Sequence, residues 1–276
     1  MNLDRVLAVA RQAALAGGKE AVEGMHDLKY LSWKGPHDPV VGRSLDVQRA
    51  IIDVIQEAFP EHAILAEEGP DDEPMPIDAD PLWIVDPICG SSNYLHHDPR
   101  YAVCVGYREA GFWQVGVVYE AAASNLYTAL RGGRAELNGE RIQTEQFGEG
   151  NEAMERAMVG IDWPTSLELR RDMTIVVNVL SNQALGLRTL GSPALGICNV
   201  AAGRWHGYTA MGLKLWDVAP ASVILQAAGG VITNGLGASW MHSDDGSCIA
   251  SNATLHGRLI TSFGPLNALR RTAAPT

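Results

Sequence analysis

The segment 83–94 constrains the fold and function of this chain more than any other. An apolar run leads directly into Asp86, and Pro87 is expected to end the strand because proline cannot donate to a sheet ladder. The sequence Gly90-Ser91-Ser92 then supplies backbone N–H groups and hydroxyls. A carboxylate at a strand end beside such a loop suits a metal ion and a phosphate held side by side. Cys89 is unexpected, because it places a soft thiol where a hard oxygen ligand would be favoured.

The composition is that of a folded protein without a basic surface. The chain has 276 residues, of which 46% are hydrophobic and 19% charged, and its formal net charge is −11. That length is sufficient for one large domain or two closely packed ones. The negative charge argues against nucleic acid or an anionic membrane as a main partner. A phosphorylated metabolite can still bind if a divalent cation supplies positive charge.

The sequence predicts a cytoplasmic protein. The first residues lack the charged and then apolar layout of a signal peptide. No apolar run approaches the roughly 20 residues that a membrane-spanning helix requires. The cysteines are scattered without a C-x-x-C pair, which favours free thiols in a reducing compartment. They are Cys89, Cys104, Cys198 and Cys248.

Two helices and then a series of strands are predicted for the first half. An amphipathic helix covers 3–24, although Gly17-Gly18 weakens it, and Ser44 is expected to cap a second helix. A short strand at 63–66 ends on an acidic pair, and a polar loop follows. Turn signals separate the next strands, which are expected at 82–85, 101–107, 113–119 and 125–130.

Helices and strands alternate in the second half, and a boundary is expected near 144–156. The predicted domains are therefore 1–145 and 146–276, packed as one compact unit. Helices are expected over about 167–182, 193–202, 216–229 and from about 253 onward. Strands are expected near 187–190, 205–209 and 248–250.

Three acidic positions stand at the ends of predicted elements: Glu67, Asp86 and Asp217. Each has an ordinary structural explanation when taken alone. An acid at a helix start favours the helix dipole, and Asp-Pro commonly begins a turn. Element ends are nevertheless where side chains from distant parts of a sequence converge.

Taken together, the motifs resemble the inositol monophosphatase family, which belongs to the metal-dependent, lithium-sensitive sugar phosphatases. Six ordered segments covering most of the chain are far more specific than any one of them. They are 34–40, 67–69, 86–94, 131–142, 190–195 and 216–219. The resemblance implies a mixed α+β or α/β fold, the layered α-β-α-β-α sandwich of the inositol monophosphatase and fructose-1,6-bisphosphatase type. It also implies a homodimer.

The resemblance further implies a site that binds hard cations such as Mg²⁺. Mg²⁺ takes oxygen ligands, and two or three such ions can bridge a phosphate ester and activate water. Matching positions imply that Glu67, Asp86, the Ile88 carbonyl and Asp217 hold metal, with Ser91 among the catalytic groups. Mn²⁺ or Zn²⁺ are alternatives. The residues expected on the substrate side are Lys34, Gly90, Ser91, Ser92, Gly191, Ser192 and Ala194.

This chain departs from the family pattern at positions that hold metal or activate water in the family. Cys89 replaces the usual aspartate ligand, and Val41 replaces a threonine. Ser44 replaces the aspartate that, in the family, helps to deprotonate the attacking water. Such general-base assistance is typically worth about 10²–10⁴-fold in rate. Ala210 replaces an acidic residue that often contacts polyol hydroxyls.

Three functions are therefore open at the level of sequence. The first is a Mg²⁺-dependent phosphomonoesterase for a small sugar, polyol or related phosphate. The second is a catalytically degenerate homologue that binds a phosphorylated metabolite. The third is a repurposed enzyme that uses Cys89 and a different metal. The histidine pair 96–97 is expected to form a surface turn, and Cys89 is expected to be a small residue filling the vacated metal pocket rather than a nucleophile.

Overall fold

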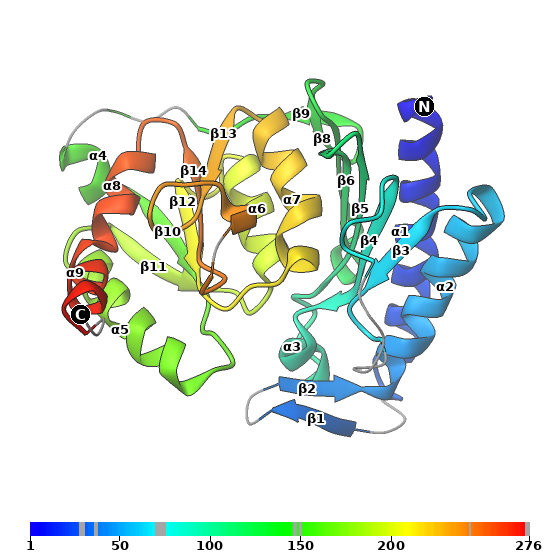
Figure 1. Cartoon of the computed structure of the whole chain (residues 1–276), viewed down its shortest axis with the longest axis horizontal. Coiled ribbons are helices and arrows are strands. Elements are labelled where there is room, and N and C mark those ends of the chain that lie inside the picture. The colour runs from blue at the N-terminus through cyan, green and yellow to red at the C-terminus, as the bar shows by residue number, and fades with distance from the viewer. Residues whose placement is uncertain are drawn as a thin grey trace.

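The protein is a layered α-β-α-β-α sandwich, as the sequence predicted (Figure 1). The computed structural model describes residues 1–27, 31–35, 38–69, 76–145, 148, 151–242 and 244–273. Two sheets lie roughly side by side, with helices between them and helices on both outer faces (Figure 1). The strands of the larger sheet, which end at Ile142, all precede those of the smaller sheet along the chain.

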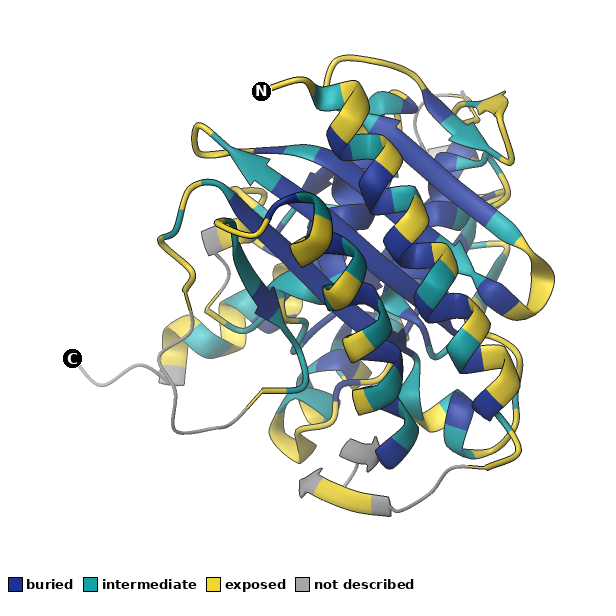
Figure 2. Ribbon diagram, turned by 90° about the vertical axis from the view of Figure 1, so that its right-hand side faces the viewer, coloured by how far each residue is buried: buried dark blue, intermediate teal, exposed yellow. Residues whose placement is uncertain are grey.

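The first outer layer consists of α1 (Leu3–Gly24) and α2 (Gly42–Ala58), which cover a seven-stranded sheet. The faces of these helices that contact the sheet are buried and their outer faces are exposed (Figure 2). The strand order is β3-β4-β5-β6-β7-β8-β9, parallel only between β3 and β4. The strands are β3 (Ala63–Ala66), β4 (Leu82–Cys89), β5 (Ala102–Glu109), β6 (Phe112–Glu120), β7 (Asn125–Leu130), β8 (Ala135–Leu137) and β9 (Glu140–Ile142).

The glycine pair in the middle of α1 serves close packing. A Cβ on Gly17 would lie 2.6 Å from a side-chain carbon of Ile51 in α2. A Cβ on Gly18 would lie 2.4 Å from the ring of Tyr119 in β6. The helix therefore continues through a pair that lowers its intrinsic helix propensity, because packing on both sides compensates.

The central layer consists of α6 (Pro193–Ala201) and α7 (Leu215–Ala227), which lie between the two sheets (Figure 1). Most residues of α7 are buried, because it contacts β5 and β6 on one side and β13 on the other. Its closest approach is to Gly116, where a Cβ would lie 2.1 Å from the carbonyl oxygen of Pro220. Glycine is thus required in β6 for α7 to lie at this distance.

The second sheet is five-stranded, with the order β11-β10-β12-β14-β13. Its strands are β10 (Met158–Ile161), β11 (Gly186–Thr189), β12 (Gly207–Ala210), β13 (Gly230–Thr233) and β14 (Cys248–Asn252). Its outer helices include α5 (Leu167–Ser181), α8 (His256–Ser262) and α9 (Gly264–Ala273). The shorter elements are β1 (Leu31–Gly35), β2 (Asp38–Val41), α3 (Ser91–Leu95), α4 (Asn151–Glu155), η1 (Ala121–Ala123) and η2 (Trp240–His242).

Two local predictions were wrong. Pro87 does not end β4, because the strand resumes pairing at Cys89 after a shift of register that follows Asp86. A bulge of this kind accommodates a residue that cannot donate to the ladder. Ser44 is not a helix cap, because α2 already begins at Gly42 and Ser44 is buried inside its first turn.

Within the described ranges, no helix has the length and apolar character required to cross a membrane.

Candidate functional site

A cavity of about 330 Å³ brings most of the predicted site residues together. It lies where the end of β4, the start of α3 and the start of α7 meet. The predicted residues that line it are Glu67, Asp86, Ile88, Cys89, Gly90, Ser91, Ser92, Gly191 and Asp217. Acids that are distant in sequence thus converge at one cavity.

The remaining predicted residues occupy other positions. Ser192 and Ala194 are fully buried and do not belong to the cavity lining. Ser44 is buried in α2, also away from the lining. The side chains of Lys34 and Val41 lie outside the described part of the structure.

Asp86 is the most unusual acid of the cavity. It is only 1% exposed, and its Oδ1 accepts a hydrogen bond of 3.0 Å from the Ile88 N–H. Among the described residues, its Oδ2 has no hydrogen-bond partner. Burial raises the pKa of Asp86 well above its ordinary value, and the nearby groups of Cys89, Glu67 and Asp217 raise it further, as does a side-chain hydrogen bond with Glu67. A cation would satisfy this oxygen and offset the repulsion between the acids, so the donor set fits a metal.

Asp217 reaches the cavity from the opposite layer. It lies in the first turn of α7, where its Oδ2 accepts a hydrogen bond of 2.7 Å from the Lys214 N–H. This capping contact fixes the carboxylate at the helix start, where the helix dipole also favours negative charge. The same contact that begins α7 therefore positions an acid at the cavity.

The turn from β4 into α3 requires glycine at position 90. Gly90 has a φ of 114°, in the left-handed region. A Cβ there would lie 3.0 Å from the Gly191 carbonyl oxygen. The turn is also fixed from behind, because the buried Tyr94 hydroxyl donates a hydrogen bond of 2.7 Å to the Ala21 carbonyl of α1. Gly90 and Ser91 are thus held at the cavity by backbone packing.

Cys89 is a buried thiol at the cavity floor. Its Sγ accepts a hydrogen bond of 3.4 Å from the Ala194 N–H. A side-chain hydrogen bond with Cys104, together with burial, raises the pKa of Cys89 well above its ordinary value. The protonated form is thus favoured, and a neutral thiol is a poor substitute for the usual aspartate ligand of Mg²⁺. All four cysteines are free and buried.

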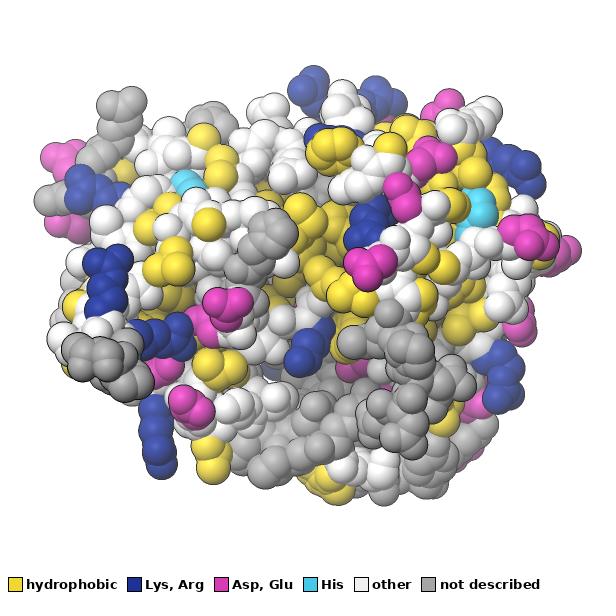
Figure 3. Space-filling view, viewed as in Figure 1, with side chains coloured by type: hydrophobic (Ala, Val, Ile, Leu, Met, Phe, Trp, Pro, Cys, Tyr) yellow, Lys and Arg dark blue, Asp and Glu magenta, His cyan; other side chains and the backbone are white. Residues whose placement is uncertain are grey.

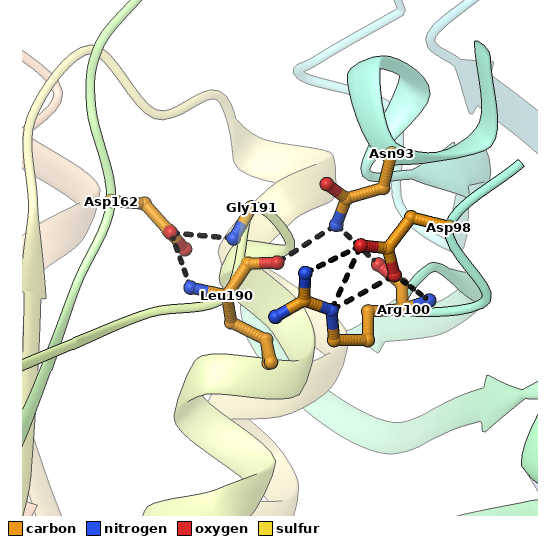
Figure 4. A network of polar contacts seen from close by, with 6 residues as sticks. All are labelled: Asn93, Asp98, Arg100, Asp162, Leu190 and Gly191. Atoms are coloured by element: carbon orange, nitrogen blue, oxygen red, sulfur yellow. Dashed lines mark hydrogen bonds and ion pairs between the residues drawn. The ribbon is translucent and has the colours of Figure 1, made fainter. Parts of the chain in front are cut away.

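Asp162 is a cavity residue that sequence reasoning missed. It follows β10, and its Oδ1 accepts hydrogen bonds of 3.1 Å and 2.6 Å from the N–H groups of Leu190 and Gly191 (Figure 4). Its Oδ2 accepts a hydrogen bond of 2.9 Å from the Tyr208 hydroxyl. Burial raises the pKa of Asp162 to about 6 despite these donors. An acid directly after a short apolar run was the available signal, the same one that marked Glu67 and Asp86.

The contacts of Asp162 continue into the first half of the chain. Asn93 of α3 donates from its side-chain amide to the Leu190 carbonyl at 2.8 Å and to the Arg100 carbonyl at 2.6 Å (Figure 4). Arg100 in turn pairs with Asp98. The loop at Leu190 is therefore held by both halves, which fixes Gly191 relative to Gly90.

A larger cavity of about 780 Å³ lies beside this one and shares the segment 212–214 with it. Its lining includes Asp172, Asp245 and Arg270, and the Arg270 guanidinium bridges the two carboxylates. The acids of the smaller cavity do not line the larger one; these are Glu67, Asp86, Asp162 and Asp217. The acids that the sequence predicted for the site therefore line the smaller cavity.

The layered fold and the acidic cavity between its layers agree with the class of protein that the sequence motifs resemble. Residues 2–267 match the sequence profile of the inositol monophosphatase family. The chain is 30% identical to the inositol-1-monophosphatase of Bacillus subtilis, over 95% of this chain and 97% of that protein. It is 29% identical to Nus factor SuhB of Pseudomonas aeruginosa, over 94% and 96% of the two chains. The crystal structure of the extragenic suppressor protein suhB from Bartonella henselae matches with a TM-score of 0.86 at 27% identity, covering 94% and 98%.

The chain therefore belongs to the inositol monophosphatase family, as its motifs indicated. Members of this family bind phosphorylated substrates and are generally metal-dependent. The expectation that nucleic acid plays no part is not supported, because several relatives carry the name Nus factor. On the face drawn in Figure 3, acidic and basic side chains are interspersed and do not gather into a patch of one sign.

Proposed function

We propose that the protein is a Mg²⁺-dependent phosphomonoesterase that hydrolyses a small sugar, polyol or related phosphate. The observation that carries this proposal is the buried Oδ2 of Asp86, which lacks a hydrogen-bond partner among the described residues. Asp86 lines the same cavity as Glu67 and Asp217. Asp86 is fully buried, whereas Glu67 and Asp217 are half-buried. Holding a buried carboxylate next to two further acids is costly unless a cation accompanies them. The relatives named as inositol monophosphatases support the same conclusion.

In this proposal Glu67, Asp86, the Ile88 carbonyl and Asp217 hold the metal. Bound Mg²⁺, or Mn²⁺ in its place, would supply charge stabilisation to the phosphate oxygens and lower the pKa of a coordinated water. Asp86 would offer its Oδ2 to the metal, because its Oδ1 already accepts from the Ile88 N–H.

The surrounding residues bind and orient the ester. The N–H groups of Gly90 and Ser91 at the start of α3, with the hydroxyls of Ser91 and Ser92, would hold the phosphate. Gly191 would face the polyol. Lys34 stays a proposed substrate-binding residue, because its side chain lies outside the described part of the structure. Ser192 and Ala194 act from behind the cavity wall, because both are buried.

Phosphate release from a panel of phosphomonoesters in Mg²⁺ or Mn²⁺ tests this function. We expect turnover in the wild type that disappears in Asp86→Asn and falls strongly in Glu67→Gln. Glu68→Gln is the matched control, because Glu68 adjoins Glu67 but does not line the cavity. Equal activity in Glu67→Gln and Glu68→Gln would contradict the assignment of the site.

A second function is supported by Ser44 and Cys89: binding of a phosphorylated metabolite without efficient hydrolysis. Ser44 offers a hydroxyl and not a carboxylate base, and it lies buried away from the cavity lining. Cys89 is held as a thiol, so that the second metal position lacks an oxygen ligand. Loss of general-base assistance alone lowers rates about 10²–10⁴-fold.

The double variant Ser44→Asp with Cys89→Asp separates the two functions. A wild type that binds a phosphate ester without releasing phosphate, beside an active double variant, would establish the second function. An active wild type would establish the first. We also propose a homodimer and a reducing compartment, which sedimentation of the native protein and thiol titration of the protein unfolded directly from cells would test.

A further inference from the structure

Cys104 joins Asp86 and Cys89 in a compact group of donor atoms. One carboxylate oxygen of Asp86 and the sulfurs of Cys89 and Cys104 all lie within 4.8 Å of one another. Cys104 lies directly opposite Asp86 in the pairing of β4 with β5, so their side chains emerge on the same face of the sheet. The register shift at Pro87 then brings Cys89 beside them.

The group is buried, and one of its donors is unsatisfied. Asp86, Cys89 and Cys104 are at most 2% exposed. The side chains of Cys89 and Cys104 hydrogen-bond to each other. Asp86 shares a side-chain hydrogen bond with Glu67, although its Oδ2 has no partner among the described residues. Two sulfurs and a carboxylate oxygen form a donor set that suits Zn²⁺. In proteins Zn²⁺ is usually four-coordinate and accepts both sulfur and oxygen ligands. Mg²⁺ is excluded from such a set, because it requires oxygen ligands.

We propose that Asp86, Cys89 and Cys104 form a thiolate site for Zn²⁺. Three protein ligands leave a fourth position open, as in catalytic zinc sites. That position faces the cavity, because Asp86 and Cys89 line it while Cys104 lies behind them. Each thiol gives its proton to solvent when the metal binds, and no electron is transferred. The site shares Asp86 with the proposed phosphatase centre but does not require hydrolysis, so it extends beyond that function.

Titration of the purified full-length protein with Co²⁺, a spectroscopic substitute for Zn²⁺, tests the site. We expect an intense sulfur-to-cobalt charge-transfer band that saturates stoichiometrically. Zn²⁺ should abolish the band and Mg²⁺ should not. Cys89→Ser and Cys104→Ser should each weaken it strongly, because each removes one of two thiolates, and the double variant should lose it. Cys248→Ser is the matched control, because Cys248 is a buried cysteine outside the group and should retain the band.

Cys89→Asp keeps the result interpretable if a serine variant fails to fold. This variant restores the usual ligand of the family and should fold, bind divalent cations and show a clearly weaker charge-transfer band, because only the Cys104 thiolate remains. A wild type without the band, or a band of unchanged intensity in either Cys89→Ser or Cys104→Ser, would overturn the proposal. Phosphate release in Mg²⁺ is scored separately, so that its absence beside a cobalt band would reject only the phosphatase function.

Discussion

Replacing Asp162 by asparagine should stabilise the folded protein at neutral pH. The carboxyl is buried, and its pKa of about 6 exceeds the ordinary value of 3.8. Each tenfold change in a proton equilibrium corresponds to about 1.4 kcal/mol, so ionised Asp162 costs about 3 kcal/mol in the folded state. The asparagine side-chain oxygen would still accept from the N–H groups of Leu190 and Gly191. The Tyr208 hydroxyl can rotate to accept a hydrogen bond from the asparagine side-chain nitrogen.

The pH dependence follows from the direction of this shift. Between about pH 6 and pH 3.8 the folded protein binds a proton at Asp162 that the unfolded chain does not bind. The wild type therefore gains stability relative to Asp162→Asn as the pH falls through this window. By about pH 4.5 it should recover about 2 kcal/mol of the difference seen at about pH 7.5. All other titrating groups are common to both proteins and cancel.

Urea unfolding followed by tryptophan fluorescence at the two pH values measures this difference. Asp98→Asn is an informative control, because its hydrogen bond with Arg100 lowers the pKa of Asp98. Asp98→Asn should therefore be less stable than the wild type at both pH values, because the contribution of a carboxyl with a lowered pKa is lost only below its ordinary value of 3.8. A stability difference for Asp162→Asn that does not change with pH would refute the claim that Asp162 is buried in its ionised form.

Three further results are expected. Gly116→Ala should destabilise the fold by about 1–3 kcal/mol in urea unfolding, because its Cβ would meet the Pro220 carbonyl oxygen, a backbone atom that cannot turn aside. Asn93→Ala should cost about 1–3 kcal/mol in the same assay, because the Leu190 carbonyl loses its amide donor. Burial lowers the pKa of His256 to about 4, so the wild type should lose stability as the pH falls below 6.5, and His256→Asn should remove that part of the slope.

Each of these expectations has an outcome that contradicts it. Gly257→Ala is the control for Gly116→Ala, because a Cβ on Gly257 meets no atom within 4 Å, and it should not destabilise. Equal effects of the two substitutions would contradict the packing argument. An unchanged stability of Asn93→Ala would show that water replaces the amide. Identical acid slopes for the wild type and His256→Asn would show that His256 titrates normally.

Local periodicity in the sequence was sufficient to predict most elements. The strands at 63–66 and 125–130 coincide with the prediction, and the helix predicted over 167–182 extends over Leu167–Ser181. Apolar spacing determines which face of such an element is buried, and that information is local. The helix predicted from about 253 is instead two helices, α8 and α9, and its beginning was placed too early.

Features that depend on how distant strands pair could not be read from the chain. Cys104 belongs to the donor group only because its register places it opposite Asp86. Asp162 reaches the cavity because β10 and the loop after β11 end at the same edge of the second sheet. Proline at position 87 indicated a strand end, but a bulge allowed pairing to resume. Pattern alone cannot distinguish these outcomes, because they are set by tertiary contacts.

The burial of α7 on two sides has a consequence for how the protein unfolds. Its side chains contribute to the packing of both sheets, so neither sheet retains a complete hydrophobic core once this helix leaves. Local opening that exposes one half would therefore expose the other. Slow hydrogen exchange in β6 and β13 should accordingly report one common free energy of opening, that of the whole protein.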